Sequence, residues 1–288
     1  MRVVIYPIQK MQKSDLKRKI RLSELHEVKK LLRASCLHTV CEEAMCPNIE
    51  ECFAKRTATF MIMGDVCTRN CKFCNVKNGE VLPLDDNEPS RIAEAAHKMN
   101  LKHIVVTSVT RDDLKDGGAE HFKKVIEAIK QKCPGSSIEV LTPDFNGSQT
   151  DISIVLSARP DIFNHNIETV KRLSPSIRPK ADYSRSLSVL NFASKSGVRT
   201  KSGIIVGLGE TEPEIKETMK DLFDSGVRIL TIGQYFAPPS ERAMKVQKFY
   251  DEKFFNDAKQ YGLALGFDYV FAGVYVRSSY MAEEVFKG

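Results

Sequence analysis

Short apolar runs alternate with longer amphipathic stretches from about residue 59 onward. The apolar runs are rich in Val and Ile, which favours β-strands, and most of the stretches between them have the periodicity of a helix with one buried face. This alternation is typical of βα units built around a parallel sheet. Strands are predicted at 59–64, 102–108, 137–143, 161–166, 200–207 and 228–235, and helices at 88–100, 117–132, 149–158, 183–197, 212–225 and 251–265.

Six βα units are fewer than the eight that close a TIM barrel. We therefore predict the α/β class and a partial (β/α)6 TIM-like barrel over residues 59–250, preceded by an N-terminal extension at 1–58. Residues 251–288 would add a helix, a short strand at 268–272 and a polar tail. Because ligands of parallel sheets bind at the carboxyl ends of the strands, polar residues just after each strand are the candidates for a site.

Three cysteines follow the first predicted strand in the sequence CTRNCKFC: Cys67, Cys71 and Cys74. A structural zinc site needs four ligands, commonly as two separated pairs, and no second pair follows. Disulfide frameworks are typical of short extracellular chains, and no signal peptide is expected in this chain of 288 residues. An iron-sulfur cluster fits better, because three protein thiolates leave one iron open to a small molecule.

The composition is that of a soluble globular protein, with 42% hydrophobic and 28% charged residues. No apolar run approaches the roughly 18 residues of a membrane span, so no membrane is expected as a partner. Eight cysteines without a secretion signal favour a reducing compartment, and we expect the cytoplasm. The net charge of +6 favours acidic partners. Nucleic acid is not expected, because clusters of basic and aromatic residues are lacking.

A second cysteine triplet, in HTVCEEAMCPNIEECF, precedes the first strand. Its members are Cys41, Cys46 and Cys52, with four and then five residues between them. Taken alone, this spacing leaves chance clustering open. The remaining cysteines, Cys36 and Cys133, fit neither triplet and are expected to be buried or free thiols.

The first triplet resembles the signature of the radical S-adenosylmethionine (SAM) superfamily, including the aromatic Phe73 directly before the last cysteine. With the second triplet, the chain is similar to the lipoyl synthase family from about residue 36 to its end. Further similar blocks are TSVTRDDLKDGGAEHF, FNHNIETV, TKSGIIVGLGET, LTIGQY and VRSSYMAEE. The resemblance implies a sulfurtransferase that inserts sulfur at C6 and C8 of a protein-bound octanoyl-lysine, forming the lipoyl cofactor.

Two 4Fe-4S clusters and SAM are the cofactors that the resemblance implies. The cluster on the first triplet would bind SAM at its open iron and generate a 5′-deoxyadenosyl radical. An auxiliary cluster on the second triplet, in the N-terminal extension, would donate the sulfur. Ser279, in the RSSY sequence of the tail, would be its fourth ligand, and a hard oxygen ligand could leave when the cluster is consumed.

The resemblance also implies protein partners. The substrates would be octanoylated carrier proteins, namely the lipoyl domains of 2-oxoacid dehydrogenases and the glycine cleavage H protein. An electron donor such as ferredoxin or flavodoxin would reduce the first cluster, and an iron-sulfur carrier protein would serve the second. Carriers of this kind are typically acidic, so the positive charge would help encounter.

Residues after the other strands would contact SAM by the same resemblance. Thr107, Ser108 and Asp113 are the candidates to hold its methionine part, although Asp112 and Asp113 could instead cap the next helix. The asparagines and the glutamate of NHNIE would bind ribose hydroxyls or the methionine amine, and His165 is expected to be a scaffold residue. The full set is Phe73, Thr107, Ser108, Asn164, Asn166, Glu168 and Gly207.

Some features leave alternatives open. Lys201 and Arg277 could meet carboxylates or the carrier, but surface solvation is the ordinary expectation for a single cation.

Another sulfur-inserting radical SAM enzyme, of the biotin synthase or methylthiotransferase type, is the second function considered, and a zinc-stapled nucleic-acid binder the third. The chain has no tryptophan, so the basic-Pro-Trp element expected before the Cys41 triplet is absent, which leaves N-terminal contacts with the carrier open.

Overall fold

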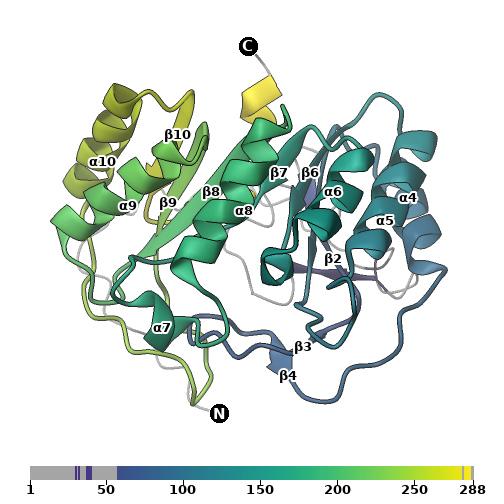
Figure 1. Cartoon of the computed structure of the whole chain (residues 1–288), viewed down its shortest axis with the longest axis horizontal. Helices are drawn as coiled ribbons and strands as arrows, with labels where there is room; N and C mark the ends of the chain where they lie inside the picture. The colour runs from purple at the N-terminus through teal and green to yellow at the C-terminus, as the bar shows by residue number, and fades with distance from the viewer. Residues whose placement is uncertain (1–29, 31, 33–36, 41–56, 281, 287–288) are drawn as a thin grey trace.

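A computed structural model describes residues 30, 32, 37–40, 57–280 and 282–286 of the chain. Its main feature is an eight-stranded sheet in which seven neighbouring strands run parallel and one short edge strand runs antiparallel (Figure 1). The order is β1 (His38–Thr39), β2 (Thr57–Ile62), β5 (His103–Ser108), β6 (Ser137–Leu141), β7 (Ile162–Asn164), β8 (Arg199–Val206), β9 (Ile229–Gln234) and β10 (Tyr269–Gly273).

All six predicted barrel strands are present, which confirms the α/β class and the mostly parallel sheet. The short strand predicted at 268–272 is β10, and it pairs parallel with β9 from Tyr269 opposite Ile229 to Gly273 opposite Gly233. The barrel sheet therefore continues past residue 250 into the predicted C-terminal part. The domain boundaries at residues 58 and 250 stay predictions.

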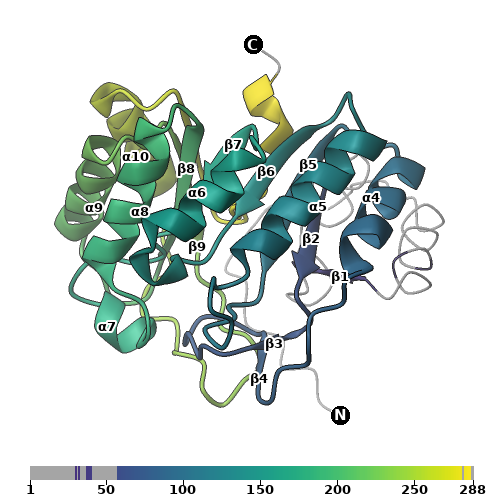
Figure 2. The ribbon, with the colours of Figure 1, turned by 45° about the vertical axis from the view of Figure 1, so that its right-hand side comes forward.

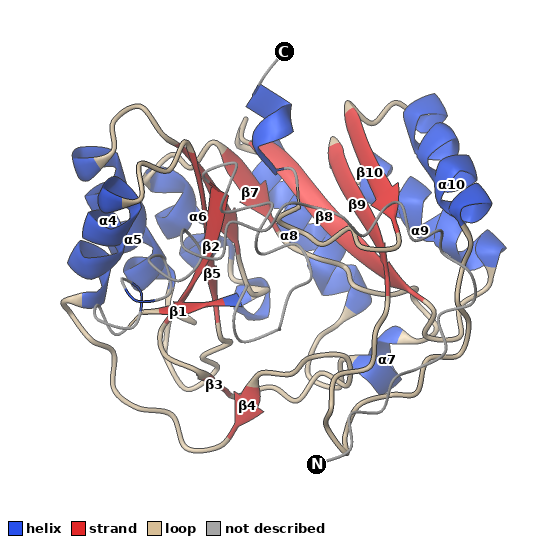
Figure 3. Cartoon of the chain, turned by 180° about the vertical axis from the view of Figure 1, so that it is seen from behind, coloured by secondary structure: helices blue, strands red, loops and turns tan. Residues whose placement is uncertain are grey.

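The long helices of the described chain lie on one face of the sheet, which leaves a concave inner face (Figures 1 and 3). A four-residue helix, α7, was not predicted from the sequence. No helix within the described ranges is long and apolar enough to cross a membrane. The helices are α4 (Glu88–Lys98), α5 (Ala119–Lys132), α6 (Gln149–Ser157), α7 (Ser174–Ile177), α8 (Tyr183–Lys195), α9 (Glu212–Asp224) and α10 (Glu252–Leu265), with 3-10 turns η1 (Phe145–Gly147) and η2 (Ala282–Phe286).

Local sequence signals explain where these helices start and stop. Thr211 and Glu214 form a capping box at the start of α9, each side chain accepting the backbone N–H of the other. Helix α10 starts at the N-cap Asp251, whose carboxylate accepts the N–H of Phe254 at 2.9 Å. It ends at Gly266, whose φ of 107° favours glycine. These ends fix the loops that form the edges of the barrel.

The main core lies between the sheet and the helices. Ile92 of α4, Phe122 and Ile126 of α5 and Ile104 of β5 are all fully buried in it. Cys133 lies in the same core as a free thiol, as expected, with its sulfur 3.8 Å from the carbonyl oxygen of Ala93. Cys36 lies outside the described residues. This main core, which lies outside the barrel sheet and is called the outer core below, is densely packed and gives the loops on the barrel edge a rigid base.

A buried ion pair lies inside the barrel, where a surface cation was expected. Lys201 Nζ is 2.9 Å from Glu139 Oε2, and both side chains are fully buried, so the surface interpretation of Lys201 was wrong. The other carboxylate oxygen accepts a 2.8 Å hydrogen bond from Asn164 Nδ2, and His103 Nε2 lies 3.6 Å from Oε2. Buried charges persist only when they are paired in this way.

Replacing Lys201 by methionine should destabilise the fold by about 3–5 kcal/mol, because Glu139 would be buried without its cation. Urea unfolding at neutral pH measures this loss. The double variant Lys201→Met with Glu139→Gln should recover much of the stability, because no unpaired charge then remains. Equal losses in the single and double variants would contradict this account of the pair.

The same pair predicts a pH dependence of stability. Burial alone would raise the pKa of Glu139, but Lys201 and His103 lower it from 4.5 to about 2. A folded-state pKa below the unfolded value means that this contribution to stability is complete above about 4.5 and is lost as the pH falls through about 2.

The C-terminal tail crosses the concave face of the sheet, and η2 lies at the edge opposite the cysteine loop (Figure 3). Near the carboxyl ends of the strands, the Ser278 hydroxyl accepts a hydrogen bond from Asn164. At the other edge, Val285 packs with Ile162 and Ile229, and the rings of Phe286 and His103 are 5.3 Å apart. The tail therefore covers the buried ion pair and delivers the RSSY sequence to the edge where parallel sheets bind ligands.

Candidate active site

The first cysteine triplet lies on the loop between β2 and α4, below the carboxyl ends of the parallel strands (Figure 2). The loop begins with a turn at Met63 and Gly64, which have φ angles of 67° and 91°. The N–H of Met63 donates to the Glu88 carboxylate at 2.9 Å, which ties the turn to the start of α4. Two very short strands, β3 (Val66–Cys67) and β4 (Lys77–Asn78), then pair to close the loop.

Backbone N–H groups point at two of the three sulfur atoms. The N–H groups of Arg69 and Thr110 lie 3.4 and 3.3 Å from Cys67 Sγ, and that of Val76 lies 3.5 Å from Cys74 Sγ. All three cysteines of the triplet are free thiols of intermediate burial. Donors of this kind stabilise thiolates and tune the potentials of iron-sulfur clusters.

Burial raises the pKa of the Cys71 thiol and raises that of Cys74 to about 11. Iron binding would therefore have to displace protons from these sulfurs. No group of three His, Cys, Asp or Glu side chains in the described part of the chain could hold a single metal ion. The thiolates of a 4Fe-4S cluster bind different irons and need not meet at one point, so the triplet fits such a cluster.

The middle of the cysteine loop is anchored to the far side of the barrel. The N–H of Lys72 donates to the carbonyl of Ile177 at 2.9 Å, and its carbonyl accepts from the N–H of Met244 at 3.1 Å. Phe73 packs against the cluster of Ile177, Leu208 and Tyr235. The predicted aromatic position therefore anchors the loop through apolar contact, and any contact of Phe73 with SAM stays a prediction.

Asn164 and Asn166 lie at the end of β7, where a site was predicted. Asn164 is fully buried, and its Nδ2 donates to Glu139 and, at 3.0 Å, to Ser278 Oγ. The Ser278 hydroxyl in turn donates to Asn166 Oδ1 at 3.1 Å, and Asn166 Nδ2 donates to Glu168 Oε1 at 3.1 Å. Polar groups of β7 and of the tail thus share one network beside the cysteine loop.

Two buried oxygen atoms of the predicted SAM-contacting residues have no hydrogen-bond partner among the described residues. They are Asn164 Oδ1 and Ser108 Oγ. Buried polar atoms are normally paired, so such atoms at a predicted site are suited to a polar ligand. Thr107 differs, because its hydroxyl donates to the carbonyl of Leu141 at 3.0 Å. These residues fit a ligand with hydroxyl, amine and carboxylate groups, as SAM has.

Glu168 stands next to the cysteines. It has a positive φ of 66°, and burial raises the pKa of its carboxyl group, while Arg178 opposes that shift. Both residues also act electrostatically on the Cys71 thiol. A carboxylate at this position can accept hydrogen bonds from an amine or from ribose hydroxyls.

Gly207 follows β8 with a φ of 103°, and a Cβ there would lie 2.3 Å from Gln234 Nε2. Its N–H and that of Leu208 donate to the two carboxylate oxygens of Glu210, at 2.5 and 2.9 Å. Sequence reasoning missed Glu210, although an acid three residues after a glycine was a usable signal. The buried carboxylate fixes this turn at the carboxyl end of β8, and any contact of Gly207 with SAM stays a prediction.

The remaining loop residues have structural partners. His165 is buried between the carbonyl of Thr142 and the hydroxyl of Ser186, as expected for a scaffold residue. Asp112 and Asp113 do not cap α5, contrary to one of the two interpretations, because their carboxylates pair with Arg69 and Arg111. Asp116 instead accepts the N–H groups of Gly118 and Glu120 at the start of α5.

The second triplet, Cys41, Cys46 and Cys52, lies outside the described residues. Its predicted fourth ligand, Ser279, is partly buried in the tail. The neighbouring Ser278 is the serine whose hydroxyl reaches the two asparagines. Arg277 lies over the ring of Phe236, at 5.4 Å from its centre. The structure therefore brings the RSSY sequence to the barrel edge, and the auxiliary cluster stays a prediction.

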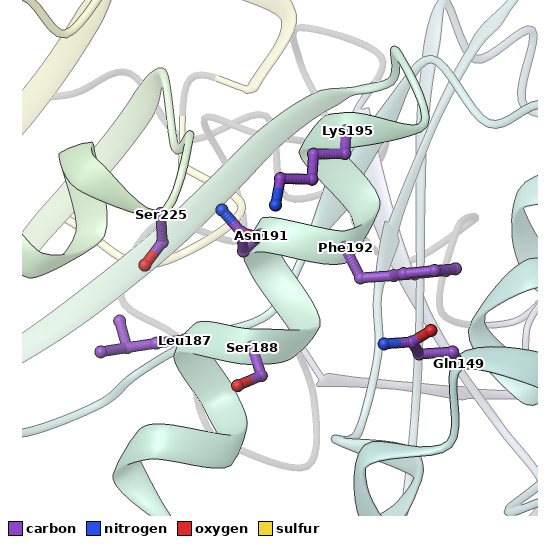
Figure 4. A pocket seen from close by; sticks show the side chains of 7 residues that line it. All are labelled: Gln149, Leu187, Ser188, Asn191, Phe192, Lys195 and Ser225. Atoms are coloured by element: carbon purple, nitrogen blue, oxygen red, sulfur yellow. The ribbon is translucent and has the colours of Figure 1, made fainter.

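A cavity of about 510 Å³ lies elsewhere, on the helix-covered side of the barrel (Figure 4). Most of its lining comes from α8, and none of it from the cysteine loop or the ends of the strands. We therefore do not place the active site there. The lining residues are Gln149, Leu187, Ser188, Asn191, Phe192, Lys195 and Ser225.

Solved structures share this fold. SuiB from Streptococcus suis, whose structure was determined with bound S-adenosylmethionine, matches with a TM-score of 0.59 and 13% identity, over 88% of this chain and 61% of that chain. A methylornithine synthase matches with a TM-score of 0.55 and 12% identity, over 93% of this chain and 84% of that chain. At these identities the likeness shows the fold alone.

Sequence comparison identifies the family. Residues 61–222 match the model of the Radical SAM superfamily. A lipoyl synthase of Caldicellulosiruptor saccharolyticus is 56% identical over 91% of this chain and 93% of its own length. A lipoyl synthase of Rubrobacter xylanophilus is 55% identical over 90% of this chain and 81% of its own length. With the cysteine loop on the carboxyl edge of a radical SAM barrel, these matches show that the chain belongs to the lipoyl synthase family of radical SAM enzymes.

Proposed function

We propose that this chain inserts two sulfur atoms at C6 and C8 of an octanoyl group linked to a lysine of a carrier protein. The observation that carries the proposal is the juxtaposition of the cysteine loop, the polar end of β7 and the tail at one edge of the barrel. The similarity to lipoyl synthases supports this substrate over that of a biotin synthase or methylthiotransferase.

Cys67, Cys71 and Cys74 would hold the radical-generating 4Fe-4S cluster. When bound there, the cluster and SAM supply the 5′-deoxyadenosyl radical that removes hydrogen from the octanoyl carbons. The unpartnered oxygens of Asn164 and Ser108 and the carboxylate of Glu168 would orient the polar groups of SAM. The anchored loop would hold the cysteines and this polar surface in fixed relative positions.

A second 4Fe-4S cluster, on Cys41, Cys46, Cys52 and Ser279, would be the sulfur donor. What supports this assignment is the position of the tail, since the hydrogen bonds of Ser278 keep the neighbouring Ser279 near the radical-generating site. A serine oxygen is a harder ligand than a thiolate, so its bond to iron can be given up as the cluster is consumed.

Substituting the two serines separately tests this assignment. Ser279→Ala should abolish sulfur insertion while SAM cleavage continues, because only the auxiliary cluster loses a ligand. Ser278→Ala should leave insertion measurable, with a stability loss of about 1 kcal/mol per hydrogen bond to the asparagines. Mass spectrometry of the product and urea unfolding measure the two effects. Loss of insertion in Ser278→Ala alone would contradict the assignment to Ser279.

The partners follow from the same proposal. The substrate would be an octanoylated carrier, either a lipoyl domain of a 2-oxoacid dehydrogenase or the glycine cleavage H protein. Ferredoxin or flavodoxin would provide electrons, and an iron-sulfur carrier protein would rebuild the donor cluster. The net charge of +6 suits these acidic proteins, and the cytoplasmic location stays a prediction.

Anaerobic incubation of the reconstituted chain with SAM, a reductant and an octanoyl-lysine peptide tests the function. We expect about eight irons per chain, since each cluster holds four, and a peptide that gains two sulfur atoms. Formation of 5′-deoxyadenosine without any thiolated peptide would retain the superfamily and contradict the substrate. A colourless protein that binds zinc would contradict the two-cluster account.

A further inference from the structure

Arg69 is the one arginine between the cysteines of the first triplet, and its side chain turns away from solvent. The side chain is only 6% exposed. It meets two carboxylates that come from different barrel loops, Asp112 after β5 and Asp144 after β6. A buried cation held by two acids inside a cofactor-binding loop needs an explanation beyond surface solubility.

The geometry of this contact is that of a clamp. Arg69 Nε is 2.9 Å from Asp112 Oδ2, and Nη2 is 2.7 Å from Asp112 Oδ1. The same Nη2 is 2.7 Å from Oδ1 of the fully buried Asp144, whose other oxygen lies 3.0 Å from Arg185 Nε. Only a planar guanidinium group can make such a two-sided contact, because a lysine ammonium group presents a single charged point.

Thr68 strengthens the clamp from the backbone side. Its N–H and its hydroxyl both donate to the carbonyl of Thr110, each at 3.0 Å, and the N–H of Asp112 donates to the hydroxyl at 3.0 Å. The N–H groups that lie nearest to Cys67 Sγ belong to Arg69 and Thr110. Arg69 therefore belongs to the clamp and also contacts the first cysteine through its backbone, and Thr68 ties the clamp to Thr110, the other donor to that sulfur.

We propose that Arg69 is a positioning residue that fixes Cys67 against the β5 and β6 loops and balances the charge beside the radical-generating cluster. The four charged groups of the clamp, Arg69, Arg185, Asp112 and Asp144, sum to zero. His165 acts electrostatically on Asp144, and Arg178, Glu168 and Arg69 act electrostatically on Cys71. Removal of one clamp charge would therefore leave an uncompensated charge near the cluster.

The role of Arg69 rests on the proposed cluster site, and it predicts the direction in which the midpoint potential of that cluster shifts in each variant. A nearby negative charge disfavours the electron that the cluster must accept, and a positive charge favours it. Arg69→Gln should therefore lower the midpoint potential of the SAM-binding cluster. Asp112→Asn, which removes an acid from the same clamp, should raise it. A role limited to holding the fold together would not produce shifts of opposite sign.

The experiment is an EPR-monitored redox titration of the reconstituted full chain, following the signal that changes when SAM is added. In Arg69→Gln, kcat for SAM cleavage should fall on the order of tenfold or more, with KM for SAM nearly unchanged. Arg69→Lys, which keeps the charge, should restore the potential but only part of kcat. Arg91→Gln is the matched control, because it removes an arginine of α4 from its partly exposed pair with Asp85 and should change neither quantity.

Potentials that shift in the same direction in Arg69→Gln and Asp112→Asn, or that do not shift, would overturn the proposal. Thermal unfolding of the cluster-free protein shows whether Arg69→Gln folds. If it does not, the midpoint potentials of Asp112→Asn and Arg69→Lys still test the proposed role of Arg69. An unshifted potential in Asp112→Asn overturns it in that case. All of these readouts omit the carrier, so a failure of sulfur insertion alone would count against the proposed function and not against the role of Arg69.

Discussion

Cys71→Ala should reduce the formation of both 5′-deoxyadenosine and the lipoyl product by more than about a hundredfold. Loss of a residue that only hydrogen-bonds a metal ligand already lowers activity by up to about a hundredfold, and Cys71 would be a ligand itself. Cys71 precedes the anchored Lys72 in the loop, and its thiol is under the electrostatic influence of Glu168 and Arg178. Without its sulfur, the remaining two cysteines would not hold the cluster that binds SAM. Liquid chromatography of the nucleoside and mass spectrometry of the peptide measure both products.

Cys133→Ala is the control for this variant. Cys133 is a free thiol in the outer core, and its loss removes one small buried group without touching the cysteine loop. Both products should form at the wild-type rate, with a stability loss of about 1 kcal/mol. Normal nucleoside formation in Cys71→Ala would contradict the assignment of the first triplet.

Cys41→Ala should separate the two halves of the reaction. Sulfur insertion should fall by more than about a hundredfold, because the donor cluster loses a ligand. SAM cleavage should continue near the wild-type rate, since the first triplet and the β7 asparagines are unchanged. The same two assays measure the ratio of nucleoside to product.

Two outcomes of the Cys41→Ala experiment would count against the donor assignment. A normal yield of lipoyl peptide would show that the second triplet is not needed for sulfur insertion. Loss of SAM cleavage together with insertion would show that the two triplets do not act separately. Iron analysis accompanies the assay, and the variant should retain about four irons per chain, the content of one cluster.

The fold was largely predictable because strands buried on both faces have simple apolar patterns. The apolar runs IVV in β5 and GIIV in β8 are typical of such strands, and the long helices between them were predicted, whereas the four-residue α7 was missed. The path of the tail was not predictable, because polar residues after the last strand have no periodicity. Lys201 was wrongly expected at the surface, since nothing near it in the sequence reveals its buried partner Glu139.

The position of the candidate site was predictable, because the first cysteine triplet and the NHNIE sequence each follow a predicted strand and lie at the carboxyl edge of the sheet. The second triplet lies outside the described residues, and its role stays a prediction. The site was not predictable where the function of a residue depends on a distant partner. Asp112 was interpreted as a possible cap of the next helix, and its carboxylate instead contacts Arg69. Ser278 and Ser279 are adjacent in the sequence, and only the structure shows that the first is bound to Asn164 and Asn166.

The most direct test of the two-cluster account follows the sulfur itself. The chain is reconstituted with iron and a heavy isotope of sulfide, freed of excess sulfide, and given SAM, reductant and octanoyl-lysine peptide without oxygen. Mass spectrometry should find the heavy isotope at both sulfur positions of the lipoyl peptide, with at most one product per chain. A product that contains only light sulfur, or one formed in many turnovers without added sulfide, would contradict the claim that the auxiliary cluster is the donor.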